Sequence, residues 1–377
     1  MRKRCVPYLH GSQTIVGNTL NSMISGQSLH MKLGEGETSY ARNSKNAQQN
    51  RMKPFIENAV TSLMESADDV PSSIVIADLG CSSGPNAIGL VSTAVSAISQ
   101  HCSLRKQAEP EICVLLNDLP NNDFNSVAKS LVALQQSSPS SAALLTGIVP
   151  GTFYKRLFTS NSLNLVLSSN SLHWLSEPPE ILKSNGIPMY DNDEGLRRTR
   201  RPLVVQAYAQ QFRKDFTVFL GLRAKELVPG GRMVVSLLGS GTSRCIEPWD
   251  TITVPLNDMA SRGSIRREMV DSFYVPMHAP SNNELSKIID DEGSFKINNL
   301  QVHELMHGMD KGSITPKKTA IAVTAIFEPI IVQHFTPSEE LMHEFVTTLE
   351  RHLIPGSPVH ADTLDNRVFL CVSLTRV

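Results

Sequence analysis

The sequence lacks most features that would assign it to a membrane protein, a disulfide-rich secreted protein or a nucleic-acid-binding protein. No apolar run in its 377 residues reaches the length of a membrane-spanning helix. Only six cysteines occur, without metal-ligand spacing, so we expect reduced intracellular thiols. The 35 basic and 36 acidic residues create no positive field that would attract nucleic acid. We therefore expect neither a nucleic-acid nor a membrane partner.

The first 28 residues contain no acidic side chain and lack the apolar core of a secretory signal. We predict a disordered leader over residues 1–28 and one globular domain over residues 29–377. An organellar transit peptide is the alternative for the leader, because it has basic residues at its start and is rich in serine. The predicted compartment is the cytoplasm.

The most informative motif of the sequence is the stretch 72–86. Residues 74–76 form a β-branched run typical of a strand buried in a parallel sheet. The run leads to Asp78, then to a turn with two glycines and Pro85, and then to a helical pattern. A strand, a glycine-rich turn and a helix N-terminus favour a nucleotide-type cradle, with a purely structural turn as the alternative. The glycine spacing differs from G-x-G-x-x-G, which disfavours a dinucleotide site.

Strands and helices alternate along the chain, which predicts a doubly wound α/β sheet. Beyond the first strand, the patterns predict strands over residues 111–119, 163–167, 232–238, 295–305 and 368–374. The predicted helices cover residues 53–65, 123–134, 203–227, 282–291, 319–335 and 338–352. The segments near 176–202 and 242–280 are too long for simple connections, so we expect insertions over the carboxyl edge of the sheet.

Polar residues follow the predicted strands at positions suited to ligand binding. Asp118 follows the second strand, where a carboxylate can accept hydrogen bonds from both ribose hydroxyls of a nucleoside; an Asx turn before Pro120 is the alternative. His173 and Trp174 follow the next buried strand and could hold an anion through N–H donors, or pack in the core. The chain has no hydrolase triad order, no H-E-x-x-H and no P-loop lysine, so hydrolase and kinase functions find no support.

Several residue groups together resemble the signatures of the SABATH methyltransferases of plants. They are Asp-Leu-Gly-Cys-Ser-Ser-Gly-Pro-Asn at 78–86, Asn-Asp-Leu-Pro at 117–120, Pro-Gly-Thr-Phe-Tyr at 150–154 and Trp-Leu-Ser at 174–176. The resemblance runs from about Leu29 to Val377. It implies a Rossmann-like methyltransferase sheet with helices on both faces and a helical substrate cap. It also implies methyl transfer from S-adenosylmethionine to small carboxylic acids or, in a caffeine-forming branch, to purine nitrogens.

The resemblance also implies the residues of the binding sites. Those of the S-adenosylmethionine site are Tyr40, Ser44, Asp78, Cys81, Asn86, Asp118, Leu119, Thr152, Phe153, Ser169 and Asn170. Those of the substrate site are Gln48, His173, Trp174 and Trp249. In some members Mg²⁺ binds near the substrate lobe, and Asn185, Asp271 and the Phe273 carbonyl match its ligands. Members of the family often form homodimers.

Carboxyl methylation is the predicted reaction. A carboxylic acid is already ionised at neutral pH, so methyl transfer needs positioning and no general base. We expect methyl esters of salicylate-, benzoate-, anthranilate- or jasmonate-type acids. Two alternatives stay open: N-methylation of a purine-like substrate, and a relative that binds its ligands without turnover. The second arises because Ala47 stands where the family glutamine is usual, and Gln48 follows it.

Overall fold

A computed structural model describes residues 40–65, 71–83, 87–137, 143–241, 247–304, 315–357, 359 and 367–377. For residues 40–49 it describes the backbone only. The predicted leader over residues 1–28 lies outside the described residues.

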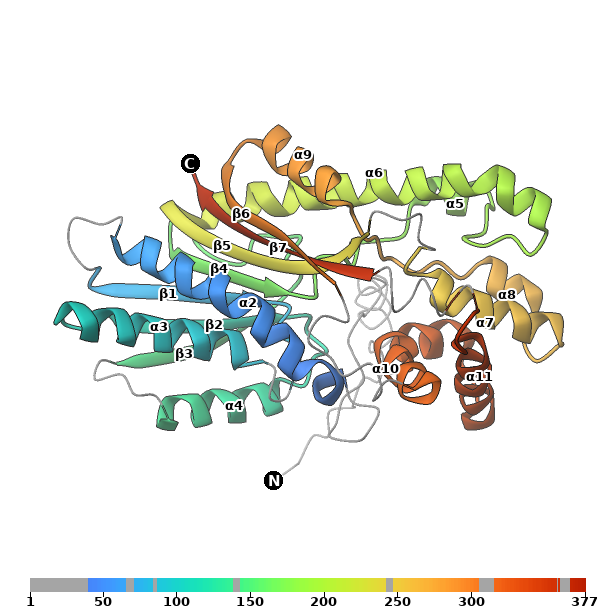
Figure 1. The fold of residues 1–377 in the computed structure, drawn as a ribbon, viewed down its shortest axis with the longest axis horizontal. Coiled ribbons are helices and arrows are strands. Elements are labelled where there is room, and N and C mark those ends of the chain that lie inside the picture. Colours follow the sequence, from blue (N-terminus) through green and yellow to red (C-terminus); the bar gives the residue numbers. More distant parts are fainter. Residues whose placement is uncertain are drawn as a thin grey trace, which may run out of the picture.

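A seven-stranded sheet forms the centre of the molecule (Figure 1). Its strands are β1 Ser73–Leu79, β2 Glu111–Asp118, β3 Leu144–Pro150, β4 Leu163–Ser169, β5 Leu227–Ser240, β6 Phe295–Glu304 and β7 Arg367–Arg376. Their order is β3-β2-β1-β4-β5-β7-β6. The first five strands pair in parallel, and β7 runs antiparallel to β5 and β6. The α/β prediction is confirmed.

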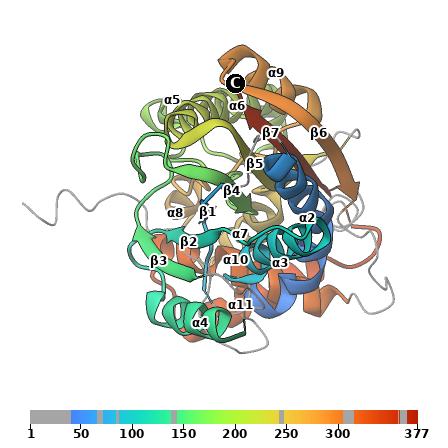
Figure 2. The same cartoon turned by 90° about the vertical axis from the view of Figure 1, so that its left-hand side faces the viewer.

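Helices cover both faces of this sheet, as expected. Helices α2 (Tyr40–Glu65), α3 (Gly89–Arg105) and α4 (Phe124–Ser137) lie on one face, and α6 (Glu194–Glu226) and α9 (Asn282–Glu292) lie on the other (Figures 1 and 2). Side chains of β1 alternate between the two faces: Ile74 and Ile76 join one hydrophobic cluster, and Ala77 and Leu79 join the other. This alternation follows from the period of two in a strand.

A group of helices lies beyond the carboxyl ends of the parallel strands (Figure 1). It contains α5 Glu180–Ser184, α7 Asp250–Ser261, α8 Arg267–Asp271, α10 Pro316–Phe335 and α11 Glu339–His352. Helix α11 packs against α7 and α10, which closes the group into a cap. Among the described helices, none combines the length and apolar character needed to cross a membrane. The four cysteines in the described part of the chain are free thiols, as predicted.

Three elements differ most from the sequence-based prediction. Helix α2 begins at Tyr40, 13 residues before the predicted start at residue 53. Helix α6 begins at Glu194, nine residues before the predicted start, so part of the expected 176–202 insertion is helical. The Asp193 side chain caps it by accepting the Leu196 N–H at 2.8 Å, and Pro202 lies inside the helix despite the hydrogen bond that proline removes. Strand β3 was not predicted, because its half-buried side chains form no continuous apolar run.

Candidate active site

The carboxyl ends of β1, β2 and β4 bring the predicted polar residues to one edge of the sheet. Asp78 of β1 lies in register between Leu116 of β2 and Leu167 of β4. The turn after β1 is tied to β2, since the N–H groups of Gly80 and Cys81 both donate to the Asn117 carbonyl at 2.9 Å. The strand order therefore builds one compact polar edge from segments that are distant in sequence.

The Asp118 carboxylate is held by two backbone N–H groups. Its Oδ2 accepts from Ser82 at 2.6 Å and its Oδ1 accepts from Leu119 at 2.7 Å. The Ser82 bond reaches across to the turn after β1, which an Asx turn before Pro120 would not do. A carboxylate oxygen can accept more than one hydrogen bond, so this side chain can bind a donor in addition to these backbone groups. The side chain is therefore pre-oriented beside the glycine-containing turn.

Gly80 shows how closely the surrounding segments approach this turn. It has a φ of +74°, and a Cβ placed there would lie 2.2 Å from Ser171 Oγ and 3.6 Å from Phe153 Cε1. Ser171 Oγ also donates to the Gly80 carbonyl at 3.1 Å. Glycine is required here, and the segments after β3 and β4 both contact the turn.

Two residues that support this edge were missed as site residues. The Asn117 side chain is fully buried and donates to the carbonyls of Val149 at 2.7 Å and Gly151 at 2.8 Å, tying β2 to the end of β3. Ser171 fastens the segment after β4 to the β1 turn. Asn117 stands directly before Asp118 in the sequence, and a polar residue at the end of a buried strand is the signal that could have identified it.

Asp78 is a buried carboxyl with an unusual protonation equilibrium. Burial and the nearby Asp118 carboxylate raise its pKa to about 8, although a hydrogen bond from the Leu79 backbone opposes the shift. The same causes raise the pKa of the Cys81 thiol far above its ordinary value, so this thiol stays protonated. Two carboxyl groups and the buried Ser169 Oγ, which has no hydrogen-bond partner within the described part of the chain, fit a ligand that carries positive charge and hydroxyl groups. S-adenosylmethionine is such a ligand.

The raised pKa of Asp78 predicts that the stability of the ligand-free protein depends on pH. The pKa of Asp78 is about 8 in the folded protein and 3.8 in the unfolded chain. The contribution of this group to the free energy of unfolding is therefore complete below pH 3.8 and is lost as the pH rises through about 8. Asp78→Asn removes the ionisable group. In urea titrations between about pH 5 and pH 9, we expect this variant to lose less free energy of unfolding than the wild type. Parallel losses in the two proteins would contradict the raised pKa.

His173 is buried in its neutral form. Its Nδ1 accepts the Leu238 N–H at 3.2 Å, so the single ring proton is on Nε2. Burial lowers the pKa of this imidazole to about 3. His173 therefore supplies an N–H donor at neutral pH and carries no positive charge.

Trp174 is fixed from two directions. The Tyr154 hydroxyl donates to its carbonyl at 2.7 Å, and its backbone forms an isolated bridge with Met277. Its ring contacts His173 at a centroid distance of 5.8 Å and Phe327 at 5.8 Å. Together His173 and Trp174 form a rigid aromatic pair with N–H donors, located directly after β4.

The remaining predicted residues lie in several environments. Trp249 is fully buried at the start of α7 and packs against Tyr208 with ring centroids 4.2 Å apart. Its indole N–H has no partner among the described residues. Leu119, Thr152 and Asn170 lie beside Asp118, Phe153 and Ser169 in the segments that follow β2, β3 and β4. The side chains of Tyr40, Ser44 and Gln48, and the whole of Asn86, lie outside the described residues.

The predicted magnesium ligands lie in the cap. Asn185 ends α5 and donates through Nδ2 to the Ile181 carbonyl at 2.7 Å, which leaves its Oδ1 for another partner. Asp271 ends α8 and Phe273 follows it. Burial raises the pKa of Asp271, and the Asp191 carboxylate adds to this shift. No cluster of three or more His, Cys, Asp or Glu side chains occurs in the part of the chain that the structure describes, so a metal here would use the mixed amide, carboxylate and carbonyl set.

Comparisons with known proteins identify the family of this chain. A family model described as SAM dependent carboxyl methyltransferase matches residues 26–377. Salicylate carboxymethyltransferase of Clarkia breweri is 37% identical, with 85% of this chain and 91% of the relative covered. Jasmonate O-methyltransferase of Arabidopsis thaliana is 36% identical, with 88% and 96% covered. A solved structure of loganic acid methyltransferase with SAH has a TM-score of 0.75 at 29% identity, with 92% of this chain and 98% of that chain covered.

The resemblance to the SABATH methyltransferases is thereby confirmed. The family model covers most of the chain, and the cradle at the carboxyl ends of β1, β2 and β4 lies where such sheets bind their ligands. The chain belongs to the S-adenosylmethionine-dependent carboxyl methyltransferases.

Proposed function

We propose that this enzyme forms methyl esters of small carboxylic acids of the salicylate, benzoate, anthranilate or jasmonate type. The observation that carries the proposal is the His173–Trp174 pair beside the cradle. The hydrogen bond from Leu238 leaves His173 with an Nε2–H donor, and its low pKa keeps it uncharged. Such a pair suits an anion that must be oriented, and it does not suit a reaction that needs a proton acceptor.

We assign S-adenosylmethionine to the cradle, where it supplies an electrophilic methyl group when bound. Asp118 would accept the ribose hydroxyls, and Leu119 would pack on the adenine together with Thr152 and Phe153. The remaining residues assigned to this ligand are Tyr40, Ser44, Asp78, Cys81, Asn86, Ser169 and Asn170. The support for this assignment is the pre-oriented Asp118 carboxylate, the close approach at Gly80 and the need of buried Asp78 for a favourable partner.

Positioning explains how these residues would promote the reaction. The acid is ionised at neutral pH, so no side chain has to remove a proton. Trp174, His173 and the Gln48 amide would hold the carboxylate, and Trp249 would shape the pocket around the remainder of the acid. Orientation of this kind can provide a large part of a rate acceleration because it replaces an encounter in solution.

Two other functions would give different labelled products. N-methylation of a purine-like substrate replaces the proton of a ring N–H, so it needs a group that accepts this proton, and the His173–Trp174 pair offers only N–H donors. The second alternative, a relative that binds its ligands without turnover, is suggested by the shifted glutamine near Gln48.

A screen with methyl-labelled S-adenosylmethionine over benzoate-, salicylate-, anthranilate- and jasmonate-type acids, with a xanthine in parallel, separates the three functions. We expect label in at least one acid. Label only in the xanthine, or tight cofactor binding without any transfer, would overturn the proposal.

We also propose Mg²⁺ as a ligand of Asn185, Asp271 and the Phe273 carbonyl. Oxygen donors of these types, completed by water, suit Mg²⁺. Burial raises the pKa of Asp271 and the nearby Asp191 adds to the shift, whereas Arg267 opposes it. Arg200 pairs with Asp191 at 3.0 Å, so a cation at Asp271 would add to charge neutralisation that is already partial. Millimolar MgCl₂ is expected to raise the melting temperature relative to EDTA, and Asp271→Asn is expected to abolish the difference. Equal Mg²⁺ stabilisation of the wild type and the variant would contradict this assignment.

A further inference from the structure

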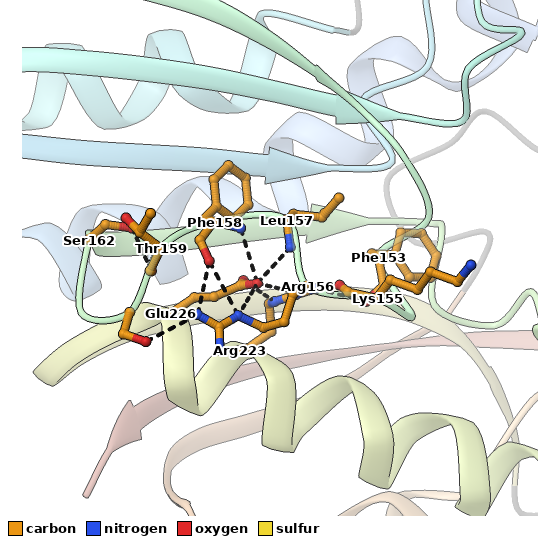
Figure 3. Close-up of polar contacts among 10 residues, drawn as sticks. Phe153, Lys155, Arg156, Leu157, Phe158, Thr159, Ser162, Arg223 and Glu226 are labelled. Carbon is orange, nitrogen blue, oxygen red and sulfur yellow. Dashed lines mark hydrogen bonds and ion pairs between the residues drawn. The ribbon is translucent and has the colours of Figure 1, made fainter.

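The loop between β3 and β4 is fastened to the end of α6 by two buried charged side chains. The loop, residues 151–162, carries Thr152 and Phe153, and Figure 3 shows Arg223 and Glu226 of α6 pointing into it. Both side chains are fully buried. Neither had been predicted as a site residue, and the mechanism described above does not use them.

Arg223 donates to the loop through the separate arms of its guanidinium group. Its Nη1 donates to the Phe153 carbonyl at 2.8 Å, and its Nη2 donates to the Lys155 carbonyl at 3.1 Å (Figure 3). Its Nε donates to Glu226 Oε2 at 2.7 Å. Only a planar fork can make these contacts at the same time, so lysine could not reproduce them.

Glu226 completes the attachment by accepting hydrogen bonds from backbone N–H groups in the other half of the loop. Its Oε1 accepts the N–H of Leu157 at 2.8 Å and of Phe158 at 3.2 Å. Arg156 Nε lies 3.4 Å from the same oxygen. The backbone from residue 153 to residue 158 is therefore held by donors and acceptors that come from one turn of α6.

The attached loop reaches the ligand cradle directly. The Phe153 ring lies 3.6 Å from the Cβ position at Gly80, so it borders the glycine-containing turn. The ring also packs edge-on against Phe219, one helical turn before Arg223. A shift of the backbone at Phe153 would therefore move one wall of the cradle.

A purely stabilising role accounts poorly for a buried ion pair at this position. Replacing such a pair by apolar side chains of similar size is often neutral or favourable for stability, because both charges lose their hydration on burial. Here the charged side chains form hydrogen bonds with backbone carbonyl and N–H groups of the loop. The arrangement restricts the loop to a single position.

We propose that Arg223 and Glu226 are positioning residues that hold Phe153 in place for the adenine of S-adenosylmethionine. The proposal rests on the assignment of Thr152 and Phe153 to the adenine. The two residues act through the loop backbone and touch neither substrate.

Arg223→Lys tests the proposal, because it keeps the charge and removes the fork. We expect the KM for S-adenosylmethionine and the Kd of S-adenosylhomocysteine to rise between about tenfold and about 100-fold, because a displaced Phe153 ring loses its contact with the adenine. Adenosine, used as a competitor, should lose affinity by the same factor. The kcat at saturating cofactor and the KM for the acid should stay within about twofold of wild type, since the lost binding energy is the same in the ground state and in the transition state.

Arg262→Lys is the matched control. Arg262 also makes a fork, with Asp258 at 3.1 Å, Glu344 at 3.0 Å and Thr348 at 2.8 Å, but it lies in the cap between α7 and α11. The control should lower the melting temperature and leave the cofactor KM unchanged. If Arg223→Lys does not fold, the double variant Arg223→Met with Glu226→Leu removes both buried charges together and retains a packed interior. We expect the same loss of cofactor affinity in that variant.

Two further measurements separate this proposal from the adenine assignment. Hydrogen exchange at the Leu157 and Phe158 amides should accelerate in the Arg223 variant, and Phe153→Ala should weaken S-adenosylhomocysteine binding. If Phe153→Ala binds like wild type, the adenine assignment fails and the proposal fails with it. If Phe153→Ala weakens binding while the folded Arg223 variants retain wild-type cofactor KM, the assignment stands and the positioning role is overturned.

Discussion

Asp118→Ala is expected to weaken the binding of S-adenosylmethionine by about 100-fold or more. A hydrogen bond to a charged group contributes roughly 1.5–3 kcal/mol, and the carboxylate is assigned two ribose hydroxyls. A loss of about 1.4 kcal/mol corresponds to a tenfold change in affinity, so even the lower value for two bonds exceeds 100-fold. The variant also releases the backbone N–H groups of Ser82 and Leu119, which loosens the turn after β1. Titration calorimetry measures the effect.

Asp123→Ala provides the control for this prediction. It removes the same charge five residues later, where Asp123 accepts the Ser126 N–H at 3.1 Å and caps α4. Loss of a helix cap costs about 1 kcal/mol of stability. We therefore expect a lower free energy of unfolding and an unchanged cofactor affinity. If Asp118→Ala binds the cofactor within about threefold of wild type while folded, Asp118 does not hold the ribose.

Trp174→Phe is expected to raise the KM for the acid by about tenfold to 100-fold and to leave the cofactor affinity unchanged. Phenylalanine keeps the aromatic contact with Phe327 but has no indole N–H, so one hydrogen bond to the carboxylate is lost. Hydrogen bonds to charged groups are worth roughly 1.5–3 kcal/mol, which gives this range. Initial-rate measurements at saturating cofactor give the KM.

Phe327→Leu and a neutral analogue of the substrate control for packing. Phe327→Leu removes the ring beside Trp174 and retains the indole N–H, so the KM for the acid should change far less than in Trp174→Phe. The carboxamide of the same acid carries no charge, and as an inhibitor it should distinguish wild type from Trp174→Phe only weakly. Equal losses for the acid and the carboxamide would show that Trp174 acts by shape and not by holding the anion.

The polar edge of the sheet could be predicted because its polar residues lie at or shortly after the ends of the predicted strands. The carboxyl ends of neighbouring parallel strands meet, so Asp78, Asp118 and the His173–Trp174 pair were expected together from strand patterns alone. The sequence motifs then added Thr152 and Phe153. In the structure, Asp78 leads into one glycine-containing turn, and Asp118 and Phe153 contact it.

Features that depend on contacts between distant residues could not be predicted. The tautomer of His173 is set by the Leu238 N–H, 65 residues away. The attachment of the β3–β4 loop depends on Arg223 and Glu226, about 70 residues further along the chain, and no periodicity links them. The early start of α6 was hidden by Pro202, which usually marks a helix boundary and here lies inside the helix.

The chemical stability of the transferred methyl group distinguishes a methyl ester from an N-methylated product. After incubation with methyl-labelled S-adenosylmethionine and the preferred acid, the isolated product is treated with dilute alkali. A methyl ester hydrolyses and releases the label as volatile methanol, which is the result that we predict. Label that remains bound to a non-volatile product, as in an N-methylated ring, would contradict carboxyl methylation by this enzyme.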